Sequence, residues 1–413
     1  MQVQGCRGSG VQGLAASSAF AVGLSVALIA QAPRVELTGL AVMPADTFAE
    51  GPPSGAFRTS AQAGKPEFRS QPVQGVSSIR PDGQGDADWL ALIDNGFGTR
   101  MNSPDSLLRI YRLHVDWAKG LAGPARPFIQ LNDASHHLPF HLVRGDTNQR
   151  WLTGGDLDPE SLVRIPDGSF WIGDEFGPYL VHVDATGRVI GQPHGLTGFA
   201  SPDAPGDLPP DAGQASAAQI RRSRGFEGLA VDSIHRYLYA ALEATPIGDP
   251  AGTTRVIEFD THTNDWTGRW WRYPLDANDQ GVTELVGLGE VFGARCDGRF
   301  LAIERDNMQG DTARFKRVFE VTLGTGATGA AMPLQTTKQL VADLLDVDNP
   351  RGLGGLGARF AFPYITTEAL WPVDPHTLVL VNDNNYPATG GRGPQKDVTE
   401  FIRLRLPMPL CGR

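Results

Sequence analysis

The alternation of apolar and polar residues along the chain predicts β-strands rather than helices. Five segments share one pattern: a short apolar run, a turn with Asp, Gly or Pro, and a second apolar run that ends in an acidic residue. A period of two residues is typical of strands with at least one buried face. Each segment therefore predicts a β-hairpin, and the five lie at residues 75–96, 156–177, 225–244, 284–307 and 365–385.

Further alternating runs follow these hairpins, at residues 107–116, 179–190, 254–275, 314–323 and 400–406. Repeated units of about four strands predict an all-β fold, a β-propeller, with five evident blades. A sixth, degenerate blade between residues 117 and 155 is left open, and a β-sandwich is the competing layout. The strand at residues 35–43 has no hairpin of its own. We expect it to complete the last blade and so close the ring.

The N-terminal segment has the features of a secretory signal peptide. Residues 14–30 are apolar and small, and Ala30-Gln31-Ala32 forms a small-x-small cleavage pattern. We interpret residues 1–32 as the signal peptide of a secreted or periplasmic protein; an uncleaved membrane anchor or a misassigned start are the alternatives. Residues 33–413 are then one domain, with 199–217 as a flexible insertion rich in Pro, Ala, Asp and Gly. No later segment is apolar for long enough to span a membrane.

Composition narrows the classes of partner. The 413 residues include 36 Lys and Arg against 46 Asp and Glu, a net charge of −10, and the 50 Gly and 31 Pro argue against a coiled coil. The acidic balance argues against nucleic acid and favours divalent cations or cationic ligands. The three cysteines are too few for a disulfide scaffold, and Cys296 and Cys411 as a pair or as free thiols both remain open. We expect a monomer with a small-molecule substrate.

Several familiar catalytic motifs are missing from the sequence, while acidic residues recur at one hairpin position. The chain has no G-x-S-x-G elbow, no P-loop and no H-E-x-x-H pair. In a propeller, equivalent positions of successive blades surround one axis, and carboxylates gathered there repel one another unless a cation lies between them. Oxygen ligands and irregular geometry favour calcium. The predicted metal ligands are Asp94, Asp174, Glu175, Glu227, Glu243, Glu304 and Asp383.

Basic residues close to these acids are candidates for anion binding. Arg224, Arg305 and Lys316 could hold a phosphate or carboxylate, although a salt bridge within a blade is the alternative for each. Together with Glu175 and Glu227 they form the predicted catalytic set. A single Asp-Gly or Asn-Gly cluster is ordinary turn chemistry. The prediction therefore depends on the register of the acids that end the five hairpins: Asp94, Glu175, Glu243, Glu304 and Asp383.

Longer motifs in the same regions resemble a known family. They include DNGFGTR (94–100), SLLRIYRL (106–113), residues 156–189, SRGFEGLAVD (223–232), IERDN (303–307), FKRVF (315–319) and NDNNYP (382–387). From about residue 35 to residue 407 the chain is similar to the phytase-like family of exported bacterial and plant proteins, described by an esterase-like activity of phytase. The resemblance implies a β-propeller and hydrolysis of phosphate or other esters.

Three functional hypotheses follow. The first is an exported, calcium-dependent hydrolase of phosphate esters, similar to a phytase. The second is a propeller without catalysis that binds a small ligand or a protein and uses calcium for stability. The third is a carboxylester or lactone hydrolase with a similar ion. Substrate preference separates the first from the third, and turnover of any ester separates both from the second.

Overall fold

The computed structural model describes residues 34–61, 64–205, 219–326 and 333–412. The predicted signal peptide (1–32) lies outside these residues, as does most of the predicted insertion at 199–217. The regular structure of the described part is almost entirely β-strand, with one five-residue helix, α1 (Leu288–Phe292), and three 3-10 turns: η2 (Ala294–Cys296), η3 (Gly310–Thr312) and η4 (Leu353–Gly355). The prediction of an all-β chain is thus confirmed. None of the described helices is both long and apolar enough to cross a membrane.

Twenty strands of the described residues form five antiparallel units of four, numbered here along the chain. Unit 1 contains β4 (Val76–Pro81), β5 (Asp88–Ile93), β6 (Arg109–Asp116) and β7 (Leu121–Gln130), and unit 2 contains β8 (Pro159–Arg164), β9 (Phe170–Asp174), β10 (Tyr179–Val183) and β11 (His194–Gly195). Unit 3 contains β12 (Phe226–Val231), β13 (Tyr237–Leu242), β14 (Thr253–Asp260) and β15 (Asp265–Pro274), and unit 4 contains β16 (Gly281–Gly287), β17 (Arg299–Arg305), β18 (Lys316–Leu323) and β19 (Leu334–Asp343). Unit 5 contains β22 (Thr367–Asp374), β23 (Thr377–Asn382), β24 (Thr399–Arg405) and β1 (Glu36–Met43).

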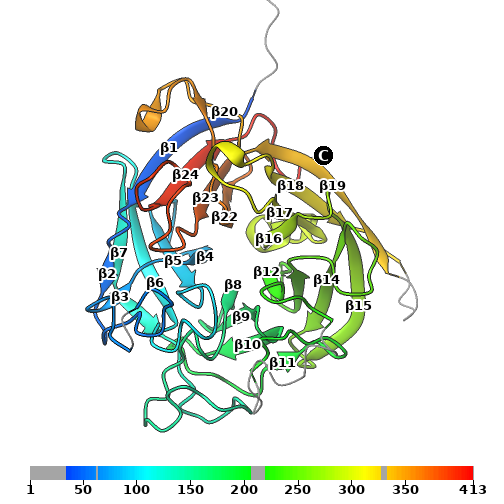
Figure 1. Cartoon of the computed structure of the whole chain (residues 1–413). Helices are drawn as coiled ribbons and strands as arrows, with labels where there is room; N and C mark the ends of the chain where they lie inside the picture. The colour runs from blue at the N-terminus through cyan, green and yellow to red at the C-terminus, as the bar shows by residue number, and fades with distance from the viewer. Residues whose placement is uncertain (1–33, 62–63, 206–218, 327–332, 413) are drawn as a thin grey trace, which may run out of the picture. The chain divides into compact units, whose positions relative to one another are not determined.

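The first strands of the five units surround a common centre. Strands β4, β8, β12, β16 and β22 contact one another in cyclic order, and Figure 1 shows their labels around one point. This is the arrangement of a β-propeller. Residues 117–155, considered for a sixth unit, supply β7 and a loop that is joined to its surroundings by isolated bridges, Leu107 with Thr153 and Asn132 with Arg188.

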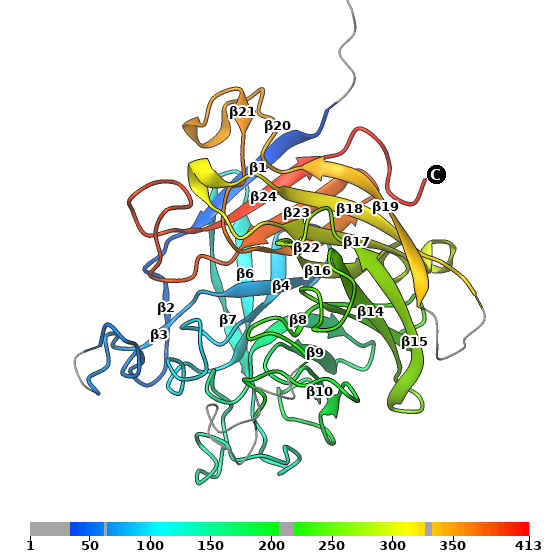
Figure 2. The same cartoon turned by 45° about the vertical axis from the view of Figure 1, so that its right-hand side comes forward.

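The N-terminal strand closes the ring, as the sequence predicts. Strand β1 pairs antiparallel with β24, from Glu36 opposite Arg405 to Met43 opposite Thr399, and both views show the two strands side by side (Figure 1 and Figure 2). A disulfide between Cys296 and Cys411, with Cα atoms 5.9 Å apart, joins η2 of unit 4 to the C-terminal segment. The open question of these two cysteines is thereby settled in favour of the pair.

Strands in the middle of a unit are buried on both faces because each unit packs between two others. On β5, Leu90 and Leu92 join the core between units 1 and 2, while Ala91 and Ile93 join the core that unit 1 shares with unit 5. Full burial of a leucine contributes about 1.5–3 kcal/mol. Short strands outside the units, β2 (Phe48–Ala49) with β3 (Gln71–Pro72) and β20 (Val347–Asp348) with β21 (Arg359–Phe360), form two small hairpins.

Candidate functional site

Each unit places one unpaired residue at the start of its first strand. The pairing of the first strand with the second is interrupted by a β-bulge at the same position in all five units. A bulge adds one residue, which is left out of the pairing and changes the direction of a side chain. The five bulged residues are Ser77, Glu160, Glu227, Thr283 and Glu368.

A second set of equivalent residues lies at the end of the second strand. In four units the backbone N–H of this residue donates a hydrogen bond to a backbone carbonyl oxygen over 2.9–3.0 Å. The acceptor is in each case the residue two positions before the bulged residue of the same unit. This repeated hydrogen bond brings each of these residues next to the bulge of its own unit. The set consists of Asp94, Glu175, Glu243 and Asp383, with Arg305 at the corresponding register in unit 4.

Five carboxylates from units 2 and 3 form the acidic cluster: Asp158, Glu160, Glu175, Glu227 and Glu243. They make two groups of three, Asp158 with Glu160 and Glu175, and Glu175 with Glu227 and Glu243. In each group one oxygen per residue lies within 4.8 Å of the others, and all five residues are buried. Glu175 belongs to both groups and so connects them.

The environment of this cluster disfavours negative charge. Burial raises the pKa values of Glu160, Glu175 and Glu227 well above their ordinary range, and the neighbouring carboxylates raise them further. Glu227 is 4% exposed, yet its Oε2 accepts no hydrogen bond from any described residue. A buried oxygen without a partner is costly unless a cation or a proton occupies it.

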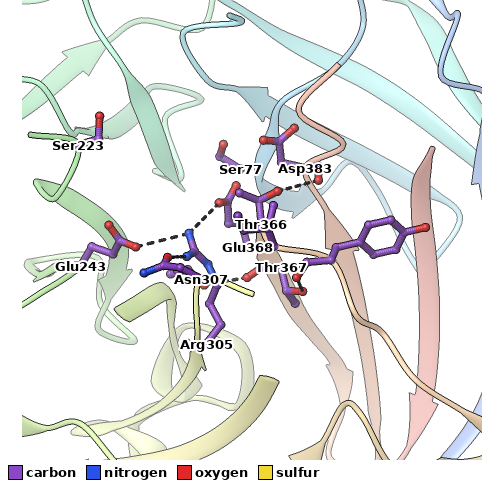
Figure 3. A network of polar contacts seen from close by, with 12 residues as sticks. Ser77, Ser223, Glu243, Arg305, Asn307, Thr366, Thr367, Glu368 and Asp383 are labelled. Atoms are coloured by element: carbon purple, nitrogen blue, oxygen red, sulfur yellow. Dashed lines mark hydrogen bonds and ion pairs between the residues drawn. The ribbon is translucent and has the colours of Figure 1, made fainter. Parts of the chain in front are cut away.

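Three basic side chains surround the cluster at different depths. The Arg305 guanidinium lies between two carboxylates, with Nη2 3.4 Å from Glu243 Oε1 and 3.5 Å from Glu368 Oε1 (Figure 3). Arg224 also pairs with Glu243. Lys316 is fully buried and binds Asp306 instead, Nζ to Oδ1 over 2.9 Å, and burial is the main cause that lowers the pKa of Lys316 to about 8.

The acids of units 1 and 5 continue the ring beside the cluster. Burial first and neighbouring carboxylates second raise the pKa of Asp94 well above its ordinary range, and burial raises the pKa values of Glu368 to about 8 and of Asp383 to about 6. Asp94 and Asp383 belong to neither group of three among the described residues. They remain predicted ligands on the same ring.

Two of the predicted ligands have other partners in the structure. Glu304 precedes the ring position and faces the opposite side of β17, where its carboxylate accepts hydrogen bonds from Lys338 Nζ (2.5 Å) and Tyr273 OH (3.2 Å). Asp174 accepts hydrogen bonds from the backbone N–H groups of Asp158 and Gly177, and burial raises its pKa to about 7. The structure therefore places Glu304 and Asp174 outside the acidic cluster.

Sequence reasoning missed three acids that the structure brings to the centre: Asp158, Glu160 and Glu368. Two of them occupy bulges, and a bulge interrupts the alternation from which strands are recognised. A signal exists nonetheless, because Glu160, Glu227 and Glu368 each stand two residues before a buried leucine with a small residue between. This Glu-small-Leu motif marks the first strand of units 2, 3 and 5.

Comparison with known proteins gives one extensive match. The family model described as phytase-like, esterase-like activity of phytase, matches residues 71–386 of this chain. An uncharacterized secreted protein of Arthroderma benhamiae is 25% identical over 207 residues, which cover 43% of this chain and 40% of that protein. The chain thus spans less than half the length of this relative.

The solved structures that this chain resembles have low sequence identity and low TM-scores. A luciferin-regenerating enzyme is 12% identical, with 90% of this chain and 95% of that chain covered and a TM-score of 0.37. The β-propeller domain of Cps50 (Swd1) from Myceliophteria thermophila is 10% identical, with 80% and 96% covered and a TM-score of 0.36. Neither similarity bears on function.

Proposed function

Since the chain belongs to the phytase-like family, we propose that it is an exported hydrolase that cleaves phosphate esters with the help of a divalent cation, calcium. We infer also that each four-stranded unit is one blade, so that the propeller has five blades. The observation that supports this function is that two sets of three acidic residues share Glu175, while Oε2 of Glu227 has no hydrogen-bond partner among the described residues.

The residues present fit a calcium ion. Asp158, Glu160, Glu175, Glu227 and Glu243 offer only oxygen ligands, and carboxylate oxygens in irregular arrangements are what calcium accepts. The cluster has fewer basic partners than acids, because Arg224 and Arg305 both pair with Glu243. A doubly charged ion would replace the missing positive charge. When bound, it would polarise a phosphoryl oxygen and lower the pKa of a water molecule.

The protein's own residues supply the remaining steps. Glu227, through the oxygen that has no hydrogen bond, accepts the proton that the attacking water loses. Glu175, which belongs to both sets of three acids, orients that water. Arg305 and Arg224 provide positive charge beside Glu243 and stabilise the negative charge that grows on the phosphoryl oxygens. Lys316, held by Asp306, adds to the positive potential around Arg305 without contacting the acidic cluster.

The experiment compares metal binding and turnover in matched variants. Calcium binding by calorimetry and hydrolysis of 4-nitrophenyl phosphate are measured for the natural chain, Glu175→Gln and Glu284→Gln. We expect Glu175→Gln to weaken calcium binding by on the order of a hundredfold and to abolish turnover. Glu284 is the control, a buried glutamate of β16 outside the cluster whose pKa burial raises to about 8. Turnover that persists unchanged in chelator would contradict the proposal.

The depth of the cluster favours a second candidate, a propeller without catalysis that is stabilised by calcium. Asp158 and Glu243 are each 1% exposed, which suits an ion that supports the fold. Calcium would then raise the melting temperature while no ester is hydrolysed. A panel that includes carboxylesters and lactones beside phosphate esters separates this candidate from both hydrolase classes.

A further inference from the structure

A cavity adjoins the ring where unit 1 meets unit 5. Its volume is about 260 Å³, and its lining includes Arg58, Asp94, Phe97, Tyr386, Pro387 and Ala388. A cavity of about 150 Å³ is enough to hold benzene. The cavity beside Asp94 therefore has room for one six-membered ring and a short substituent.

One wall of this cavity is backed by a cluster of aromatic rings. Phe97 stacks on Phe68, with ring centroids 5.8 Å apart and planes inclined by 22°. Phe68 contacts Tyr386 at 5.4 Å, and Phe48 meets Tyr386 edge to face at 6.0 Å. Rings packed in this way hold one another in place, so the wall keeps its shape when a ligand enters.

The charges at the cavity do not suit a ring that bears many phosphates. Arg58 is the one basic side chain among the described residues that line it, and its guanidinium is already paired with Glu67 and placed 5.6 Å from the rings of Phe68 and Phe97. Asp94, on the side of the cavity that faces the ring of acids, offers a carboxyl group and no positive charge. A polyphosphorylated alcohol would need several free cations here.

Asp94 lines the cavity and belongs to the ring of acids beside the acidic cluster. It occupies the same ring position as Glu175 and Glu243, and its backbone N–H makes the same hydrogen bond, to Gly75 O over 2.9 Å. The next residue, Asn95, donates two hydrogen bonds to Asp158 of the acidic cluster, from its backbone N–H to Oδ1 over 3.0 Å and from Nδ2 to Oδ2 over 2.8 Å. A group seated against Phe97 and Tyr386 therefore borders the carboxylates that would hold the ion.

We propose that this cavity binds the alcohol part of the substrate and that this part is a compact apolar ring, so that the substrate is an aryl phosphate monoester rather than an inositol polyphosphate. The inference rests on the proposed function. In the hydrolysis, the water oxygen forms a bond to phosphorus and the bond between phosphorus and the aryl oxygen breaks. One proton of the water stays on the phosphate, and the other ends on the aryl oxygen, which leaves as a phenol.

Two ligands that cannot be hydrolysed test the inference through binding alone. Phenylphosphonate carries a phenyl ring on phosphorus, and methylphosphonate carries a methyl group in its place. Calorimetry measures the affinity of the protein for each with calcium present. We expect the natural chain to bind phenylphosphonate on the order of tenfold tighter or more, because the cavity removes the ring from water. Ala388→Trp, which fills the cavity, should remove this preference. Thr389→Trp is the control, since Thr389 is exposed and does not line the cavity.

Each result separates the inference from the proposed function. Equal affinity for the two phosphonates in the natural chain, or a preference that Ala388→Trp leaves intact, overturns the inference even where phosphate esters are hydrolysed. A phenyl preference lost only in Ala388→Trp supports it even where Glu175→Gln binds calcium normally, an outcome that would overturn the proposed function instead. Ala388→Leu, a smaller change, replaces Ala388→Trp if circular dichroism shows that the latter does not fold.

Discussion

Unit 4 uses the common hairpin in the opposite way to units 2 and 3. At the end of the second strand, units 2 and 3 place Glu175 and Glu243, while unit 4 places Arg305 at the same register. The acids that flank Arg305 have basic partners inside unit 4: Glu304 binds Lys338, and Asp306 binds Lys316. The acids of units 2 and 3 face one another instead, although Glu243 also pairs with Arg224 and Arg305.

This difference separates structural charge from functional charge. A buried carboxylate with a lysine partner has its charge balanced by the protein itself and does not require a cation. A buried carboxylate whose nearest neighbours are other carboxylates remains unsatisfied until a proton or a cation arrives. The same residue type in equivalent strands therefore forms internal ion pairs in unit 4, whereas in units 2 and 3 it supplies the carboxylates of the proposed ion site.

The largest expected effect is a loss of stability as pH rises in protein freed of divalent ions. The pKa values of Glu368 and Asp383 are raised to about 8 and about 6, so the folded chain binds more protons than the unfolded chain above pH 4. The free energy of unfolding should fall by on the order of 5 kcal/mol between pH 5 and pH 8. Urea unfolding at several pH values measures it.

Calcium should reduce this pH dependence, because the ion takes the place of the protons in the adjoining acidic cluster. The same urea series with saturating calcium is the control. Stability that is constant or rises between pH 5 and pH 8 in chelator would show that the acids of the ring are already balanced within the protein, as they are in unit 4.

A smaller loss is expected when a pair of unit 4 is broken. Lys338→Met leaves Glu304 buried without its basic partner, and removing one member of a buried ion pair costs about 3–5 kcal/mol. Equilibrium unfolding in urea measures the change. Lys396→Met is the matched control, because Lys396 pairs with Asp46 at the surface and such pairs contribute about 0–1 kcal/mol. Equal losses in the two variants would contradict the interpretation of unit 4 as internally paired.

The smallest effect has the opposite sign in units 2 and 3. Glu227→Gln removes one of the facing carboxylates, whose pKa is raised by burial and by its acidic neighbours. In chelator at pH 7 we therefore expect the variant to be more stable than the natural chain by about 1–3 kcal/mol, the usual cost of a buried acceptor without a hydrogen-bond partner. With calcium the order should reverse, because the ion loses a ligand. Melting temperatures in chelator and in calcium check both signs, and destabilisation in both solutions would count against the acidic cluster as an ion site.

Much of the fold could be predicted because it depends on short-range patterns. Alternating runs located the hairpins, and the strand at residues 35–43 that lacked a partner indicated the closure. The acids at the ends of the hairpins in units 1, 2, 3 and 5 were also found at their ring positions. These are local features, repeated along the chain.

The register at the ring could not be predicted with the same accuracy. In unit 4 the pattern of acidic hairpin ends predicts Glu304, but Arg305 occupies the ring position. A shift of one residue moves a side chain to the other face of the strand. Bulges hide Glu160 and Glu368 for a related reason, since each adds a residue that alternation does not anticipate. The order of units in space, which brings Asp158 beside Glu175, is a tertiary feature.

The pairing of β1 with β24 determines when the fold can be completed. Among the described residues β1 precedes all other strands and its partner β24 follows them, so an edge of unit 5 stays open until β24 has been synthesised. The proposed ion site draws its residues from separate units, so we expect it to form late in folding, after β1 and β24 have paired.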